Sequence, residues 1–136
     1  HVVLDKGEIE SKVKELYPEG VDKMLDLTGT AVLRDSLKCV KSQGTLCLAG
    51  ILSGKWEMQN FSPMFEIPTG VKLTSYVGDY TNLTAETLQK AYSMIESGEL
   101  NIPISQVYDF EDIRAAHELM ESNLANGKIV VRVNSN

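Results

Sequence analysis

Short apolar segments alternate with amphipathic ones along this chain, and the alternation predicts strands that are connected by helices. The clearest unit lies between Val21 and Gly54. Its predicted elements are a strand at 23–27, a turn at Thr28-Gly29, a helix at 30–40, a turn at Gln43-Gly44 and a strand at 45–49. A β-α-β unit of this kind implies a parallel sheet that is covered by helices.

The carboxyl ends of these two strands are the place where a chemical site is expected. In open parallel sheets, ligands bind in the crevice beyond the carboxyl ends of the strands. Here those ends are residues 26–29 and the glycine-bounded segment 50–54. We therefore expect the edge of any site to be formed by these two loops.

The segments around this unit have weaker signals. Residues 1–4 have the pattern of an apolar strand that is already under way, which suggests a cut rather than a natural terminus, and residues 8–16 predict a short amphipathic helix. Residues 55–68 fit neither period, and their two prolines and large apolar side chains predict an ordered loop. Residues 71–77 alternate as an edge or interface strand does.

The last third of the chain predicts helix, strand, helix and strand. Thr84 has the position of a helix cap, Leu83 and Leu88 have the spacing of a hydrophobic staple, and Gly98 ends the helix. The stripe of this helix that is expected to be buried consists of Leu88, Ala91, Tyr92 and Ile95. The elements expected after it are a strand at 104–108, a helix at 111–122 capped by Asp109, and a strand at 128–133.

Composition narrows the possible functions. With 136 residues, 43% of them hydrophobic, the chain can bury one core, and a formal charge of -6 argues against nucleic-acid binding. No apolar run approaches the roughly 18 residues of a membrane helix and no signal segment opens the chain, so no membrane partner and a cytoplasmic location are expected. Cys39 and Cys47 lack the spacing of zinc ligands and are interpreted as core residues.

Five segments occur in an order and at spacings that resemble one known family. They are 20–29 (GVDKMLDLTG), 43–50 (QGTLCLAG) with Ser53-Gly54, 67–76 (IPTGVKLTSY), 110–113 (FEDI) with Ala116-His117, and 127–131 (GKIVV). Together they resemble the carboxyl-terminal part of a medium-chain dehydrogenase/reductase, in the zinc-free, NADPH-dependent quinone oxidoreductase branch.

The resemblance implies an α/β fold, namely the second half of a Rossmann-type parallel sheet with flanking helices. Residues 1–102 would form a partial nucleotide-binding domain, and residues 103–136 a strand-helix-strand segment that belongs with a catalytic domain. The sequence has no GxGxxG motif, whose following helix binds the pyrophosphate of the cofactor. The chain would therefore supply the nicotinamide-side wall of the cofactor cleft without the element that binds the pyrophosphate.

The same resemblance implies a cofactor-binding role for eleven residues, which follow the two central strands, line the edge strand or precede the last turn. They are Thr28, Gly29, Gly50, Ile51, Leu52, Ser53, Gly54, Ser75, Tyr76, Val77 and Asn123. The implied cofactor is NADP (NADPH), without zinc and without a catalytic residue in this chain. The implied partners are a quinone or an enone or other carbonyl substrate, and a second copy that pairs through the 71–77 strand.

Other interpretations remain open at this point. Asp26 is equally well explained as a helix cap, and His117 is better explained by helix packing than as a base. Tyr76 and Tyr80 have the chemistry to protonate a carbonyl but form no constellation, and Trp56 is expected to cover the loop or a subunit contact. The alternative function is a non-catalytic α/β binding or dimerisation module; a methyltransferase or receiver-like domain is less well supported.

Overall fold

The structure is a computed structural model that describes residues 1–133, apart from the side chain of Tyr80. The chain divides into two compact units, His1–Tyr80 and Thr81–Asn136, and each is described by itself. The suggested proton-donating role of the Tyr80 side chain lies outside the described part. The assignment of residues 103–136 to a catalytic domain stays a prediction.

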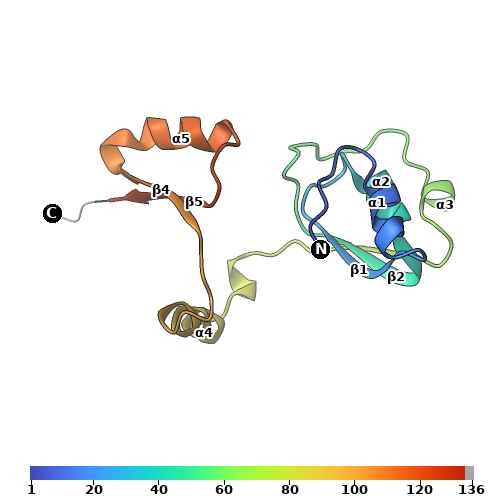
Figure 1. Ribbon diagram of the computed structural model, residues 1–136, viewed down its shortest axis with the longest axis horizontal. Helices are drawn as coiled ribbons and strands as arrows, with labels where there is room; N and C mark the ends of the chain where they lie inside the picture. The colour runs from blue at the N-terminus through green and yellow to red at the C-terminus, as the bar shows by residue number, and fades with distance from the viewer. Residues whose placement is uncertain (134–136) are drawn as a thin grey trace. The chain divides into compact units, whose positions relative to one another are not determined.

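The first unit contains a three-stranded sheet whose strands all run parallel. Its strands are β1 (Val21–Asp26), β2 (Val40–Leu48) and β3 (Lys72–Ser75), in the order β1-β2-β3. Figure 1 shows β1 and β2 side by side. Leu25 is paired with Cys47, and Asp26, Leu48 and Ser75 are in register across the sheet. The predicted parallel α/β fold is confirmed, and β3 is an edge strand of this sheet, as its alternating pattern indicated.

Strand β2 begins five residues earlier than predicted. The expected turn at Gln43-Gly44 is an irregularity within the strand, because Val21 already pairs with Val40 and the register shifts before Lys23 pairs with Thr45. Gln43 has a φ of 69°, and its backbone N–H donates to the Gly70 carbonyl at 3.0 Å. A turn-type residue therefore distorts the pairing here without ending it.

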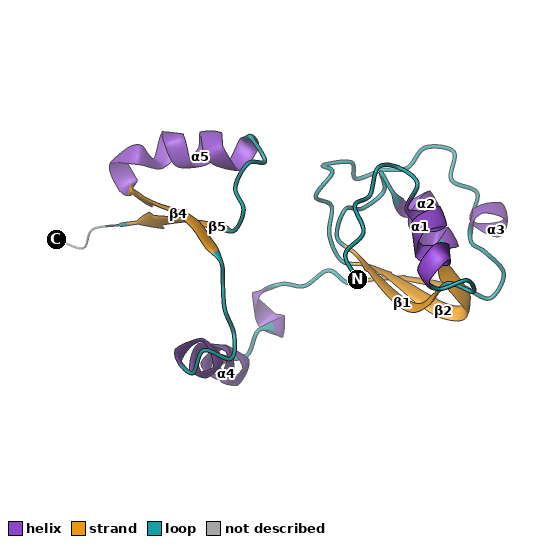
Figure 2. Cartoon of the chain, in the orientation of Figure 1, coloured by secondary structure: helices purple, strands orange, loops and turns teal. Residues whose placement is uncertain are grey.

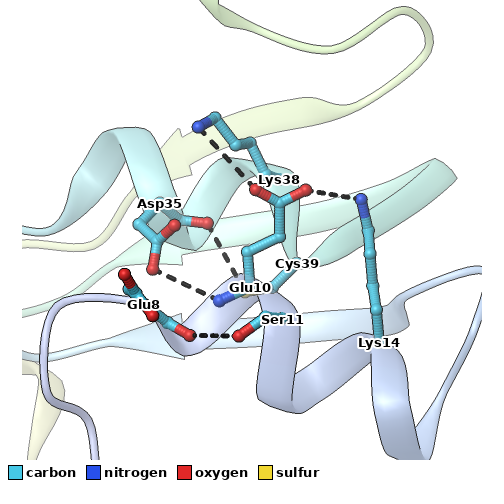
Figure 3. Close-up of polar contacts among 7 residues, drawn as sticks. All are labelled: Glu8, Glu10, Ser11, Lys14, Asp35, Lys38 and Cys39. Carbon is cyan, nitrogen blue, oxygen red and sulfur yellow. Dashed lines mark hydrogen bonds and ion pairs between the residues drawn. The ribbon is translucent and has the colours of Figure 1, made fainter.

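Two helices, α1 (Ile9–Leu16) and α2 (Leu33–Lys38), lie next to each other on one side of this sheet (Figure 2). The Glu10 carboxylate joins them, at 2.6 Å from Lys14 Nζ and 3.7 Å from Lys38 Nζ, while its backbone N–H donates to Asp35 at 3.2 Å (Figure 3). The hydrogen bond from Lys14 holds the pKa of Glu10 below its ordinary value. Helix α2 is shorter than the predicted 30–40, because residues 30–32 form turns and Val40 belongs to β2.

The core of the first unit lies between α2 and the sheet. Its buried members are Leu33, Leu37, Val40, Leu46 and Val71. Met58 and Phe61 from the 55–68 segment pack against this cluster, so the predicted ordered loop is confirmed, with one short helix, α3 (Pro63–Glu66).

The two cysteines differ in their surroundings. Cys39 is buried, as expected of a core residue, and burial with the nearby Asp35 raises the pKa of its thiol to about 11. Cys47 is only partly buried.

The predicted strand at residues 1–4 is wrong. This segment has no regular secondary structure, and the side chains of Val2 and Leu4 are exposed. A strand requires a hydrogen-bonded neighbour, and none of the described strands pairs with this segment. His1 instead packs edge-on against Tyr17, with ring centroids 6.3 Å apart.

The second unit contains helix α4 (Ala85–Glu96) and a parallel pair, β4 (Ile104–Asp109) and β5 (Lys128–Arg132). A short 3-10 turn lies at Phe110–Asp112, and another, Tyr80–Asn82, begins at the last residue of the first unit. Helix α5 (Ile113–Glu121) runs along the pair (Figure 2). The Thr84 hydroxyl accepts a hydrogen bond from the Thr87 N–H at 3.1 Å, which confirms the predicted cap.

Three expectations for the second unit are wrong. Leu88, Tyr92 and Ile95 of α4 are exposed because α5, and not α4, packs on the β4–β5 pair. The Asp109 carboxylate contacts Arg132 at 3.0 Å instead of capping the helix. His117 is exposed on α5 and does not pack between elements of its unit. No helix within residues 1–133 has the length and apolar character needed to cross a bilayer.

Candidate functional site

A pocket of about 510 Å³ lies at the carboxyl ends of the three parallel strands of the first unit. This is the edge at which ligands bind in open parallel sheets. It is lined by Gly29, Thr30, Leu48, Ala49, Gly50, Ile51, Leu52, Trp56, Ser75, Tyr76, Val77 and Gly78.

The loops that follow β1 and β2 are hydrogen bonded to each other and form one wall of this pocket. The Ala49 N–H donates to the Asp26 carbonyl at 2.8 Å, and the Leu52 N–H donates to the Leu27 carbonyl at 3.0 Å. The Ser53 N–H continues the series by donating to Thr28 at 3.1 Å. The pairing of the two strands thus extends through their loops, which holds the backbone of both loops in place.

Two glycines allow this close approach. A Cβ on Gly50 would lie 2.6 Å from the Leu27 carbonyl oxygen, a separation that real side chains do not adopt. Gly29 has a φ of 93°, and a Cβ there would lie 3.1 Å from the Gly50 carbonyl oxygen. The two glycines therefore hold the loops in direct backbone contact along this wall of the pocket.

The buried carboxylate of Asp26 holds the loop that follows β1 (the β1 loop) in place through hydrogen bonds. One oxygen accepts hydrogen bonds from the Thr28 and Gly29 N–H groups at 2.8 and 2.9 Å, and the other accepts from the Ser36 hydroxyl at 2.9 Å. Asp26 is 4% exposed and does not line the pocket. The suggested helix cap by Asp26 is wrong, because its carboxylate binds N–H groups of the β1 loop and not those of the first turn of α2.

The end of β3 forms the opposite wall. The Tyr76 N–H donates to the Leu48 carbonyl at 2.8 Å, so the ladder between β2 and β3 continues to the pocket. A Cβ on Gly78 would lie 2.7 Å from Cε1 of Tyr76. Gly78 is therefore needed for the ring of Tyr76 to lie against the backbone at this point.

The third side of the pocket is the segment that carries Trp56. The Thr30 hydroxyl lies 2.6 Å from the Lys55 carbonyl oxygen and 3.4 Å from that of Glu57, so it binds the backbone on both sides of the tryptophan. Further along, the Arg34 guanidinium donates to the carbonyls of Gln59 and Asn60 at 3.3 and 3.2 Å and pairs with Glu66. This ion pair raises the pKa of Arg34 and lowers that of Glu66.

The pocket brings together seven of the eleven residues that were predicted to bind a cofactor: Gly29, Gly50, Ile51, Leu52, Ser75, Tyr76 and Val77. Thr28, Ser53 and Gly54 lie beside the pocket without lining it. Asn123 belongs to the second unit, where it follows α5 with a φ of 56°. The structure thus gathers most of these residues, while their cofactor-binding role stays a prediction.

Five lining residues were not among the predicted site residues: Thr30, Leu48, Ala49, Trp56 and Gly78. Leu48 and Ala49 end a predicted strand, so the rule that ligands bind beyond strand ends could have included them. From the sequence, Trp56 is expected to cover the loop or a subunit contact, because nothing in the sequence indicates which way an irregular segment folds back; the structure places it in the pocket lining.

The chemical character of the pocket is neutral. Among the described residues that line it, none is an Asp, Glu, Lys, Arg or His, and their polar groups are the side chains of Thr30, Ser75, Tyr76 and Trp56 together with backbone groups. Within residues 1–133, no three His, Cys, Asp or Glu side chains are grouped as metal ligands would be. The pocket suits a flat, uncharged ring better than a phosphate.

Comparison with known families identifies the chain. A family model described as zinc-binding dehydrogenase matches residues 1–131. The chain belongs to this family and is part of a medium-chain dehydrogenase/reductase, as the five sequence segments indicated. The family's description names zinc, and the predicted absence of zinc from this protein stays a prediction.

Curated relatives are reductive enzymes of greater length. The trans-enoyl reductase poxH of Penicillium oxalicum is 34% identical over 84 residues, which cover 62% of this chain and 22% of poxH. The highly reducing polyketide synthase ltbA of Aspergillus luteorubrus is 33% identical over 124 residues, 85% of this chain and 4% of the synthase. The chain therefore spans less than a quarter of the first relative and a small fraction of the second.

Solved structures share the fold. The mycobacterial protein Rv1454c complexed with NADPH has a TM-score of 0.75 at 24% identity, covering 96% of this chain and 41% of that protein. A quinone oxidoreductase of Pseudomonas syringae pv. Tomato has a TM-score of 0.72 at 20% identity, covering 93% and 40%. The strands and helices of this chain thus match the Rossmann-like nucleotide-binding half of these proteins.

Proposed function

We propose that this chain supplies the nicotinamide-side wall of the cofactor cleft in an NADPH-dependent reductase that acts on a quinone, an enone or another carbonyl compound. The observation that carries the proposal is the pocket at the carboxyl ends of β1, β2 and β3, which is lined by seven of the predicted residues. Membership of an oxidoreductase family and the reductive chemistry named for the relatives support it.

The residues of the pocket fit a nicotinamide ring. The neutral lining does not oppose an uncharged dihydronicotinamide, and Gly29 and Gly50 keep the two loops that form one wall in close contact. The dinucleotide, when bound, supplies the reducing equivalents. This chain's task is to hold the ring at a fixed distance from the loops and to exclude water with Ile51, Leu52 and Val77.

The phosphates of the dinucleotide require a binding element of their own. The sequence has no glycine-rich turn followed by a helix, which is the element that binds a pyrophosphate. We therefore expect this chain by itself to bind NADPH weakly, with a Kd of about 1 mM or above, the value that corresponds to only about 4 kcal/mol.

The test is a titration of the ¹⁵N-labelled chain with NADPH. Backbone resonances of Gly50, Ile51 and Val77 should shift in a saturable way at millimolar cofactor. Leu52→Glu, which places a charge in the neutral pocket, should reduce these shifts, whereas Met64→Glu should not. Leu52 and Met64 are 81% and 88% exposed, so neither change should affect folding, and only Leu52 lines the pocket. Micromolar affinity, or shifts confined to other residues, would contradict the proposal.

A second candidate function is a non-catalytic dimerisation module that pairs through β3. Strand β3 has β2 on one side only, which leaves backbone groups of its other side without a partner in the sheet of residues 1–80. The Tyr76 N–H points to β2, and because N–H groups alternate along a strand, that of Ser75 points to the open edge.

Ser75→Pro therefore removes a donor from the open edge alone, and Ser75→Ala is the matched control. If the chain dimerises through β3, the proline variant should sediment at 15.0 kDa and the alanine variant at twice that mass. A dimer that forms without any NADPH-dependent shift at Gly50 or Ile51 would favour the module over the reductase.

A further inference from the structure

Trp56 is held over the pocket by anchors on both sides, although its own side chain is not buried. The Thr30 hydroxyl contacts the carbonyl oxygens of Lys55 and Glu57, and Met58 packs against the core two residues after the tryptophan. Trp56 itself is 77% exposed and lines the pocket. The backbone on both sides of Trp56 is thus fixed, while most of the residue stays accessible at the pocket.

The Thr30 contact is directed at the backbone on either side of one residue. A hydroxyl has one proton, so Thr30 donates mainly to Lys55 at 2.6 Å, and the Glu57 carbonyl at 3.4 Å lies at the limit of a shared bond. Thr30 also immediately follows Gly29, the glycine of the β1 loop. The Thr30 side chain therefore links the loop of Gly29 to the segment that carries Trp56.

We propose that Trp56 is the stacking wall of this pocket and that Thr30 is the positioning residue that holds it there. The pocket then accepts a flat conjugated ring without charge, which lies between the indole and the loops of Gly29 and Gly50. This inference rests on the proposed function, in which the ring belongs either to the nicotinamide or to a quinone substrate.

The physical basis is the cost of leaving an indole in water. A ring that covers Trp56 removes apolar surface of both partners from solvent, and offset stacking adds to this gain. Loss of the indole should weaken binding of a ring ligand roughly three- to tenfold. A non-aromatic ligand gains little from such a wall, so the indole would select for planar rings.

The experiment uses the chain's single tryptophan as the reporter. Reduced nicotinamide mononucleotide and duroquinone each carry a planar conjugated ring, and 1,4-cyclohexanedione carries the carbonyls without conjugation. Either planar probe, or both, should quench Trp56 fluorescence saturably and shift the Gly50 and Ile51 resonances, and the dione should do neither. Quenching by only one of the two planar probes identifies the source of the ring.

Variants then separate the stacking role of Trp56 from the positioning role of Thr30. Trp56→Leu should weaken the planar probe, measured by the Gly50 shift, whereas Phe65→Leu, at another exposed aromatic outside the pocket, should leave it unchanged. Thr30→Val keeps the shape of the side chain and removes the hydroxyl; it should speed the anisotropy decay of Trp56 and weaken the probe about as much as Trp56→Leu. Thr30→Ser, which keeps the hydroxyl, should behave as the wild type. In a Trp56→Leu background, Thr30→Val should cost nothing more.

Three results would overturn the inference. If the planar probes shift Gly50 and Ile51 but Trp56→Leu does not weaken them, the indole is no wall, although the proposed function stands. If Thr30→Val weakens binding equally with and without Trp56, Thr30 contacts the ligand and does not act through the tryptophan. If no probe shifts Gly50 or Ile51, the proposed function itself fails.

Discussion

The carboxylate of Asp26 and the hydroxyl of Ser36 are joined by a hydrogen bond of 2.9 Å inside the first unit, where the two residues are 4% and 2% exposed. The other carboxylate oxygen binds the N–H groups of Thr28 and Gly29. A single side chain thus ties the β1 loop to helix α2. The core beneath the β1 loop thereby fixes the position of this part of the pocket.

Removal of this carboxylate should destabilise the first unit. Asp26→Ala leaves the Gly29 N–H and the Ser36 hydroxyl buried without partners, and the Thr28 N–H partly buried. A buried group without a partner costs about 1 to 3 kcal/mol. We expect a loss of roughly 3 kcal/mol or more in the free energy of unfolding, measured by urea denaturation. Asp22→Ala, at an exposed carboxylate of the same strand that pairs with Lys41, should change the free energy of unfolding far less, because exposed ion pairs contribute little. Equal losses in the two variants would show that the Asp26 contacts do not stabilise the fold.

The two glycines of the 50–54 loop should respond differently to alanine. At Gly50 a methyl group would meet the Leu27 carbonyl at 2.6 Å, so the paired loops must separate. At Gly54 nothing lies within 4 Å, and only the φ of 69° opposes a side chain, at a cost of about 1 kcal/mol. Gly50→Ala should therefore lower the melting temperature more than Gly54→Ala and broaden the Ile51 and Leu52 resonances. The reverse order would mean that the two loops are not in contact in solution.

The sequence was a good guide where local chemistry and topology agree. Ligands bind beyond the carboxyl ends of parallel strands, and glycine there allows close backbone approach, so the sequence alone places Gly29 and Gly50 at the pocket. The Thr84 cap was equally readable, because its hydroxyl needs only a donor three residues away.

The sequence was a poor guide where structure depends on contacts between distant segments. The apolar residues 1–4 satisfy a strand pattern but have no described partner strand, and the stripe of α4 satisfies a helix pattern but is not covered within its unit. The position of Trp56 at the site likewise depends on a contact between distant segments. Its position over the pocket depends on a hydroxyl 26 residues earlier in the chain, Thr30, which no periodicity connects to it.

The chain by itself should not distinguish NADPH from NADH. The two cofactors differ by a phosphate on the adenosine ribose, and the residue that selects between them lies with the glycine-rich motif that this sequence lacks. The neutral pocket offers no cation to that phosphate. Titrations followed by the Gly50 resonance should give Kd values that agree within about twofold. A clear preference for NADPH would locate a phosphate-binding group within these 136 residues.

The Cys39 thiol should make the stability of the first unit fall in alkali. Burial, with a smaller contribution from Asp35, raises its pKa from 9.0 to about 11. Below pH 9 the thiol is protonated in the folded and the unfolded chain, so it adds no pH dependence. Between pH 9 and 11 the unfolded chain loses this proton and the folded chain keeps it, so the unfolded state is favoured by up to about 1.4 kcal/mol per pH unit.

The measurement is a series of urea denaturations between pH 8 and pH 11 on the wild type and Cys39→Ala. Lysine and tyrosine titrations are common to both proteins and cancel when their curves are subtracted. The difference between the wild type and Cys39→Ala should change by about 2 to 3 kcal/mol over this interval. Parallel curves for the two proteins would mean that Cys39 reaches solvent in the folded chain, and the packing of α2 on the sheet would then be looser than the structure has it.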